Sequence, residues 1–168
     1  MGIRLKSVFA TTALAATAVT GMAGSAQASV NRWVYLSGEG VHSGDCISAT
    51  SNGVFMEPCS RTPYQEWHEV GSNINGAPYP TVTMTNAAWG GGYCLTAISS
   101  HTLAMVYTGG LCNNSTQAFA MTGPTWQGNY QFFNFAYHAC IDSGQGGLLY
   151  PSSTGCNSNN SYQLFYAS

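Results

Sequence analysis

The sequence predicts an all-β domain built from three copies of one short unit. Two observations lead to this prediction: a phrase with two cysteines recurs three times, and short apolar runs alternate with turn-forming residues along the chain. A third observation is that no stretch shows the periodicity of an amphipathic helix. Repeats of roughly 50 residues, as here, are typical of proteins whose equivalent units pack around one shared core.

Each copy of the repeat begins with a cysteine followed by Leu or Ile and ends with Gln-x-Trp or Gln-x-Phe. The first cysteines lie 48 and 46 residues apart, and the glutamines lie 52 and 46 residues apart. The copies are Cys46-Ile47 with Cys59 and Gln65-Glu66-Trp67, Cys94-Leu95 with Cys112 and Gln117-Ala118-Phe119, and Cys140-Ile141 with Cys156 and Gln163-Leu164-Phe165. We therefore expect one closed body with up to three equivalent sites.

Short strands are predicted in every repeat. The clearest apolar or alternating runs are Trp33–Leu36, Thr81–Met84, Leu103–Tyr107 and Tyr130–Phe135. Turn-formers separate them, for example Ser51-Asn52-Gly53 and the glycine-rich run that follows Asp142. Strands of about five residues with this punctuation indicate a sandwich or barrel, with about four strands in each repeat and about twelve in all.

The N-terminal segment has the pattern of a secretory signal peptide. Arg4 and Lys6 precede a run of small and apolar residues, and Ala26-Gln27-Ala28 offers a cleavage site. We expect residues 1–28 to be removed before Ser29 and the protein to be secreted, without membrane insertion. Residues 29–168 then form one domain, with repeats at about 31–75, 76–125 and 126–168.

All six cysteines lie in this domain, and an even set in an exported chain indicates disulfides. Six cysteines allow fifteen pairings, so the sequence alone leaves the connectivity open. Pairing within each repeat is the one scheme that treats the three copies alike. It joins Cys46 to Cys59, Cys94 to Cys112, and Cys140 to Cys156.

The low number of basic residues argues against nucleic acids as partners. Arg32 and Arg61 are the only basic residues after the leader, against six carboxylates, which gives a formal net charge of −4. Two arginines cannot neutralise a phosphate backbone, so we expect no nucleic-acid binding. A surface of Asn, Ser, Thr, Gly and Tyr suits neutral, hydroxyl-rich ligands.

The cysteine spacing, the Gln-x-aromatic endings and the threefold period together resemble the ricin B-chain-like lectins. The resemblance covers residues 31–168 and implies a β-trefoil, in which three hairpins cap a six-stranded barrel. It also implies that the Gln-x-aromatic residues are structural rather than ligand contacts. We expect the aromatics to face the shared core and the glutamine amides to bind backbone groups of their hairpins. These residues are Gln65, Trp67, Gln117, Phe119, Gln163 and Phe165.

The resemblance also implies a sugar site made of three parts. The first part is a carboxylate, two residues after the first cysteine, that accepts hydrogen bonds from sugar hydroxyls. The second is an aromatic side chain before the second cysteine that stacks on the sugar ring, and the third is a side-chain amide. The third repeat supplies Asp142 and Tyr150, but Tyr162 replaces the usual Asn before Gln163, so we assign the amide to Asn160. Alternatively, Asp142 caps a turn with Ser143 and Gly144.

The other two repeats depart further from this pattern. The second has Thr96 at the carboxylate position and Tyr107 as the aromatic that would stack on the sugar, which predicts a weaker site. The first has Ser48 at that position and Glu57 near the expected aromatic, which predicts that its site is lost.

No enzymatic activity, cofactor or metal is expected. His68-Glu69 does not continue into a zinc-binding motif, and no nucleophile motif occurs. The histidines His42, His68, His101 and His138 are scattered, and we expect each to be a surface residue.

Two functions remain open: a lectin-like module that binds galactose-type or related neutral glycans, and a protein-binding trefoil. The latter is an inhibitor or the non-catalytic subunit of a toxin or adhesin, with contacts in the longer middle repeat (Ser99 to Thr116).

Overall fold

The computed structural model describes residues 31–72, 81–122 and 129–168. Within these residues the chain forms twelve β-strands and two short 3-10 helices, and no α-helix. The predicted leader (1–28) and the predicted repeat boundaries near residues 75 and 125 lie outside the described residues. The elements are β1 (Asn31–Gly38), η1 (Gly40–His42), β2 (Asp45–Thr50), β3 (Gly53–Pro58), β4 (Glu66–Ser72), β5 (Thr81–Asn86), β6 (Tyr93–Ser99), β7 (Thr102–Tyr107), β8 (Phe119–Thr122), β9 (Gln131–Asn134), β10 (Ala139–Asp142), β11 (Tyr150–Pro151), η2 (Ser161–Gln163) and β12 (Phe165–Ala167).

Six of the strands form a barrel. β1 pairs with β4, β4 with β5, β5 with β8 and β8 with β9, each antiparallel, and β12 pairs with the other side of β1. A bridge between Tyr130, just before β9, and Phe165 of β12 closes the ring. Closure removes the unpaired edges that an open sheet would expose.

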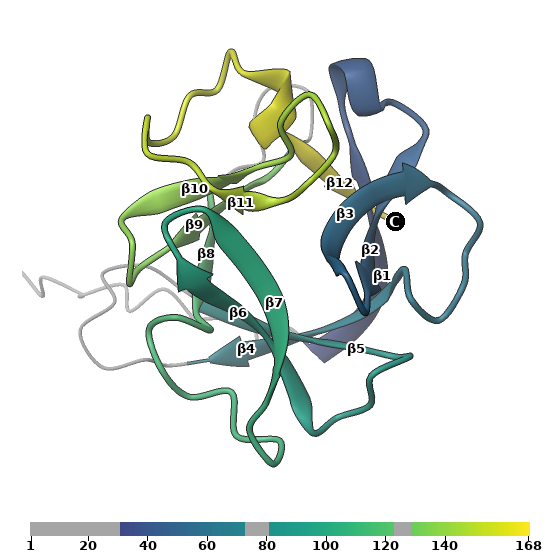
Figure 1. Cartoon of the computed structure of the whole chain (residues 1–168), viewed down its shortest axis with the longest axis vertical. Coiled ribbons are helices and arrows are strands. Elements are labelled where there is room, and N and C mark those ends of the chain that lie inside the picture. The colour runs from purple at the N-terminus through teal and green to yellow at the C-terminus, as the bar shows by residue number, and fades with distance from the viewer. Residues whose placement is uncertain (1–30, 73–80, 123–128) are drawn as a thin grey trace, which may run out of the picture.

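The other six strands form three hairpins, β2–β3, β6–β7 and β10–β11. Each repeat therefore contributes a barrel strand, a hairpin and a second barrel strand. Figure 1 shows the hairpins disposed around a common centre, with β2–β3 at the right, β10–β11 above and β6–β7 below. The predicted all-β class and the predicted twelve strands are confirmed.

The core contains the aromatic of every Gln-x-aromatic ending. Trp67, Phe119 and Phe165 are no more than 1% exposed and belong to one cluster of buried apolar side chains. The residue after each first cysteine is buried in the same cluster: Ile47, Leu95 and Ile141. Burial of one such aromatic stabilises the fold by about 2–3 kcal/mol.

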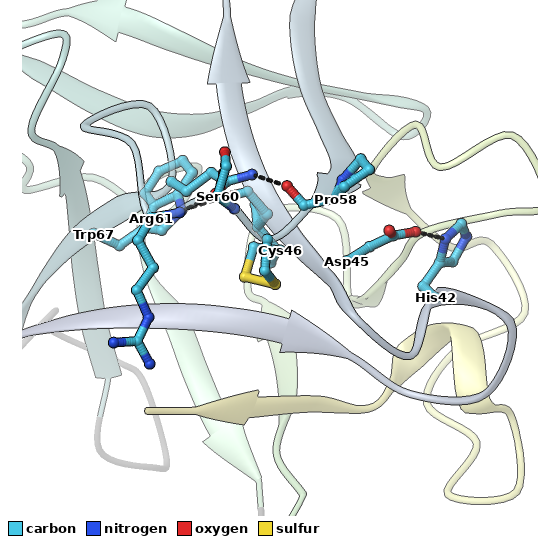
Figure 2. Close-up of a disulfide and its surroundings, with 10 residues drawn as sticks. His42, Asp45, Cys46, Pro58, Ser60, Arg61 and Trp67 are labelled. Atoms are coloured by element: carbon cyan, nitrogen blue, oxygen red, sulfur yellow. Dashed lines mark hydrogen bonds and ion pairs between the residues drawn. A yellow bond between two sulfur atoms is a disulfide. The ribbon is translucent and has the colours of Figure 1, made fainter.

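The loops are tied to the barrel by disulfides and glutamines. The disulfides join Cys46 to Cys59, Cys94 to Cys112, and Cys140 to Cys156, each within one repeat, as the repeat predicts. Figure 2 shows the first disulfide at Cys46, with Pro58, Ser60 and Arg61 near it. Gln65 Oε1 accepts hydrogen bonds from the backbone N–H groups of Ser60 (2.8 Å) and Arg61 (3.0 Å), and its Nε2 donates to the Pro58 carbonyl (2.9 Å). The other two glutamines accept one backbone N–H each, from Asn113 and Asn157.

Candidate functional site

The third hairpin brings together the three residues that the sequence assigned to a sugar site. Asp142 ends β10 and Tyr150 begins β11, and the antiparallel register places them directly opposite each other. Side chains on opposite residues of such a pair point to the same face of the hairpin. Asn160 reaches the same place from the last loop, where its Nδ2 donates to Asp142 Oδ2 at 2.8 Å.

Asp142 is only 5% exposed, and both oxygens of its carboxylate accept hydrogen bonds within the protein. Oδ1 accepts the Gly144 backbone N–H (2.8 Å), and Oδ2 accepts Gln163 Nε2 (3.3 Å) as well as Asn160. The contact with Gly144 is the turn cap that the alternative interpretation predicts. The contact with Gln163 was not expected, because the glutamine was assigned to the scaffold alone.

Tyr150 is coupled to this carboxylate. Its pKa is raised above the ordinary tyrosine value, first by burial, then by the negative charge of Asp142 and by a hydrogen bond to Asp142. Its ring also lies close to Gly144, where a Cβ would come within 3.1 Å of a ring carbon. Gly144, Asn160 and Gln163 donate to a carboxylate that has about four acceptor sites.

Asn160 has a second function at the same place. Its Oδ1 accepts the Tyr162 backbone N–H at 3.1 Å and so caps the first turn of η2. One amide therefore connects the start of η2 with the carboxylate of Asp142. Tyr162 stands where the sugar-site pattern has Asn, and its carbonyl accepts the Ser143 backbone N–H at 2.9 Å.

His42 supports this turn from the first repeat, which corrects the prediction that it is a surface residue. Its side chain is buried, with Nε2 at 2.8 Å from the Gly144 carbonyl and Nδ1 at 3.1 Å from Asp45 Oδ2 (Figure 2). Because a carbonyl only accepts, Nε2 donates to Gly144. The contact spans 102 positions of the chain, so no local pattern predicts it.

The second repeat does not bring its two predicted residues together. Thr96 is buried opposite Ala104, and its hydroxyl donates to the Cys94 carbonyl at 3.0 Å. Tyr107 lies opposite Tyr93 and is 69% exposed. Tyr150, the aromatic expected to stack on the sugar, lies eight positions after Asp142. Eight positions after Thr96 is Ala104, so the spacing in the third repeat could have shown that the second repeat has no aromatic at this position.

The first repeat contains an open pocket, although its sequence predicted a lost site. The pocket has a volume of about 580 Å³ and lies beside the β2–β3 hairpin. Its lining includes Ser48, Thr50, Glu57, Thr62, Tyr64 and Trp89. Neither aromatic was expected at this site, although Tyr64 occupies the position before Gln65, where the sugar-site pattern has a polar side chain.

No three His, Cys, Asp or Glu side chains in residues 31–72, 81–122 and 129–168 lie close enough together to hold a metal ion. In the same parts of the chain, no helix has the length and apolar character needed to cross a membrane.

Comparison with solved structures establishes the fold. A designed 3-fold symmetric protein, ThreeFoil, superposes with a TM-score of 0.62 at 13% identity, over 80% of this chain and 96% of that one. The BEL beta-trefoil superposes with a TM-score of 0.61 at 11% identity, over 81% of this chain and 91% of that one.

The chain is a β-trefoil. A third trefoil neighbour is SeviL, solved bound to asialo-GM1 saccharide, with a TM-score of 0.60 at 12% identity over 81% of this chain and 95% of that one. No protein-family model and no curated protein sequence matches the chain. At these identities the likenesses establish the trefoil architecture and not the ligand.

Proposed function

We propose that this trefoil is a secreted, non-catalytic carbohydrate-binding module of the ricin B-chain-like kind. In this proposal it recognises galactose-type or related neutral glycans through the hairpin of the third repeat. The observation that supports it is the convergence of Asp142, Tyr150 and Asn160, which come from three separate segments of that repeat. Three disulfides are typical of proteins that function in an oxidising compartment, which agrees with export.

Binding requires an exchange of hydrogen-bond donors at Asp142. A sugar diol would replace the Tyr150 hydroxyl and the Asn160 amide, while Gly144 and Gln163 keep the carboxylate in position. The released Tyr150 ring would then cover the C–H face of the sugar. Because internal contacts must be given up first, we expect weak binding with a Kd of about 1 mM, roughly −4 kcal/mol.

A glycan panel with galactosides first tests the proposal by calorimetry or NMR titration. The variants are Asp142→Asn, which removes the charge, and Tyr150→Leu, which removes the platform. The matched control is Glu66→Gln, which makes the same charge change on β4. The proposal predicts binding that both site variants lose and the control keeps, with unfolding midpoints measured in parallel. Binding unaffected by either site variant would place the glycan elsewhere, and no binding to any glycan would refute the proposal.

Recognition of a protein is the second candidate function, and one observation favours it. Three large apolar side chains of the middle repeat are more than half exposed: Ile98 (52%), Tyr107 (69%) and Leu111 (68%). Single exposed apolar residues are common, but aromatic and apolar groups are also what the centre of an interface requires. If a partner binds here, Leu111→Ser will weaken the complex and Asp142→Asn will not.

A further inference from the structure

The pocket of the first repeat is constructed differently from the third hairpin. Its walls come from β2, from the end of β3 that carries Glu57, from the loop before β4, and from the turn after β5 that belongs to the next repeat. Phe55 lies opposite Ser48, as Tyr150 lies opposite Asp142, but Phe55 does not line the pocket. A volume of about 580 Å³ is within the usual range for small-ligand sites.

Two aromatic side chains line this pocket. Tyr64 is 51% exposed, so its ring is available to a ligand. Trp89 is held in place, because its Nε1 donates to the Ala49 carbonyl at 2.8 Å and its ring packs edge-on against Tyr93 at 5.1 Å. A preorganised aromatic wall loses little entropy on binding and offers a face to C–H groups and to cations.

Hydroxyl groups also line the pocket, and one of them is unsatisfied. Ser48 is 1% exposed, and its Oγ has no hydrogen-bond partner among the described residues. A buried polar group without a partner is unfavourable, so a ligand hydroxyl that reached Ser48 would gain a full hydrogen bond. Thr50 and Thr62 add further hydroxyls to the lining.

Glu57 is the charged group of the pocket. Within the described residues, Glu69 pairs with Arg32 and Asp45 lies against His42, whereas Glu57 has no basic side chain within salt-bridge distance. The only basic residues after the leader are Arg32 and Arg61, and neither lines the pocket. A neutral ligand that covered Glu57 would remove water from a carboxylate without offsetting its charge, which is unfavourable. A protonated amine would replace the water and offset the charge.

We infer that this pocket binds an amino sugar. The protonated amine lies against Glu57, the C–H face of the ring packs on Tyr64 and Trp89, and a ring hydroxyl bonds to Ser48. The site is separate from the third hairpin and takes a cationic rather than a neutral saccharide, so it does not depend on the function proposed for Asp142.

The test uses a glucosamine trisaccharide as the probe and the N-acetylglucosamine trisaccharide as its neutral counterpart, by calorimetry with disulfides intact. We expect the amine form to bind at least about tenfold more tightly, and Glu57→Gln to abolish that preference. Tyr64→Ala should weaken binding of the amine form. Glu57 is exposed, so its variant should unfold at the same temperature as the parent.

Two controls separate this site from the third hairpin. Glu66→Gln makes the same charge change outside the pocket, and Asp142→Asn alters the other site, and neither should affect the glucosamine ligand. Failure of the amine form to bind, or equal binding of both trisaccharides with no effect of Glu57→Gln, would overturn the inference. Binding lost in Asp142→Asn and kept in Glu57→Gln would move the ligand to the third hairpin. The galactoside panel tests that hairpin independently.

Discussion

Asp142 determines the chemistry of the third hairpin, because its charge is held almost out of water and is offset only by hydrogen bonds. Such a carboxylate affects every titrating group beside it. Tyr150 is that neighbour, and loss of its proton would place two negative charges in contact. The folded protein therefore holds the phenol proton more tightly than the unfolded chain does.

We expect Asp142→Asn to lower the pKa of Tyr150, which stays above its ordinary value because burial, the largest cause, persists. The raised pKa also affects stability: this contribution is fully present below about pH 10 and is lost as pH rises through the folded pKa. The measurement is a tyrosinate absorbance titration, with Tyr150→Phe identifying the signal. An unchanged Tyr150 pKa in Asp142→Asn would contradict the coupling.

The three repeat glutamines are alike in sequence and differ in their contacts. Gln65 accepts two backbone N–H groups and donates to a carbonyl, whereas Gln117 accepts the Asn113 N–H at 3.1 Å. We expect Gln65→Leu to reduce the free energy of unfolding by about 2 kcal/mol and Gln117→Leu by about 1 kcal/mol. Urea unfolding of the two variants measures both losses. Equal losses would show that the bonds of Gln65 are replaced by water.

At the scale of elements, the turn between β10 and β11 shows how a hairpin positions a site. Gly144 has a positive φ of 53°, donates its N–H to Asp142 and offers its carbonyl to His42. A side chain there would also approach the Tyr150 ring. One residue in this conformation therefore connects the carboxylate, the aromatic and the first repeat.

Gly109 supplies a matched control, because its φ is 68° and a Cβ there would meet nothing within 4 Å. Gly109→Ala should cost only the backbone strain, about 1–2 kcal/mol. Gly144→Ala should cost more and should also shift the Tyr150 titration, since it adds the contact with the ring. Thermal unfolding and the tyrosinate titration of both variants provide the comparison. Identical behaviour would mean that the turn adjusts without affecting the hairpin.

For the whole molecule, the barrel holds the three repeats together, and its last strand closes it. β12 pairs with β1, and Phe165 forms the bridge to Tyr130 while its ring lies in the core. Ser168 and Tyr35 exchange two further backbone hydrogen bonds. The final residues therefore connect the first repeat with the third.

Deletion of residues 165–168 should abolish cooperative folding. It opens the barrel between β1 and β9 and removes a buried aromatic worth about 3–5 kcal/mol, which is a large part of the stability of a small domain. Near-ultraviolet circular dichroism and urea unfolding would detect the loss. The comparison is Phe165→Leu, which keeps the strand and should still unfold cooperatively. A cooperative transition in the deleted chain would show that the barrel tolerates an open edge.

Much of this fold could be predicted because each repeat carries its own structural signals. The cysteine pairs, the Gln-x-aromatic endings and the turn glycines act within about 20 residues of one another, and they recur in register. Asp142, Tyr150 and Asn160 could be predicted to lie together for the same reason, because all three belong to one repeat. The sequence by itself thus determined the all-β class, the threefold plan and the aromatic core, and the structure selected the within-repeat pairing from the fifteen that six cysteines allow.

Tertiary structure decided what lies between repeats. Trp89 reaches the Ala49 carbonyl from the next repeat, and His42 reaches Gly144 from the opposite end of the chain. Strand register separated Thr96 from Tyr107, and it also left a pocket beside Ser48 where the local pattern indicated none. These contacts depend on how a closed barrel positions its three hairpins. A local sequence pattern carries no information about the distances between the hairpins or about their relative orientation.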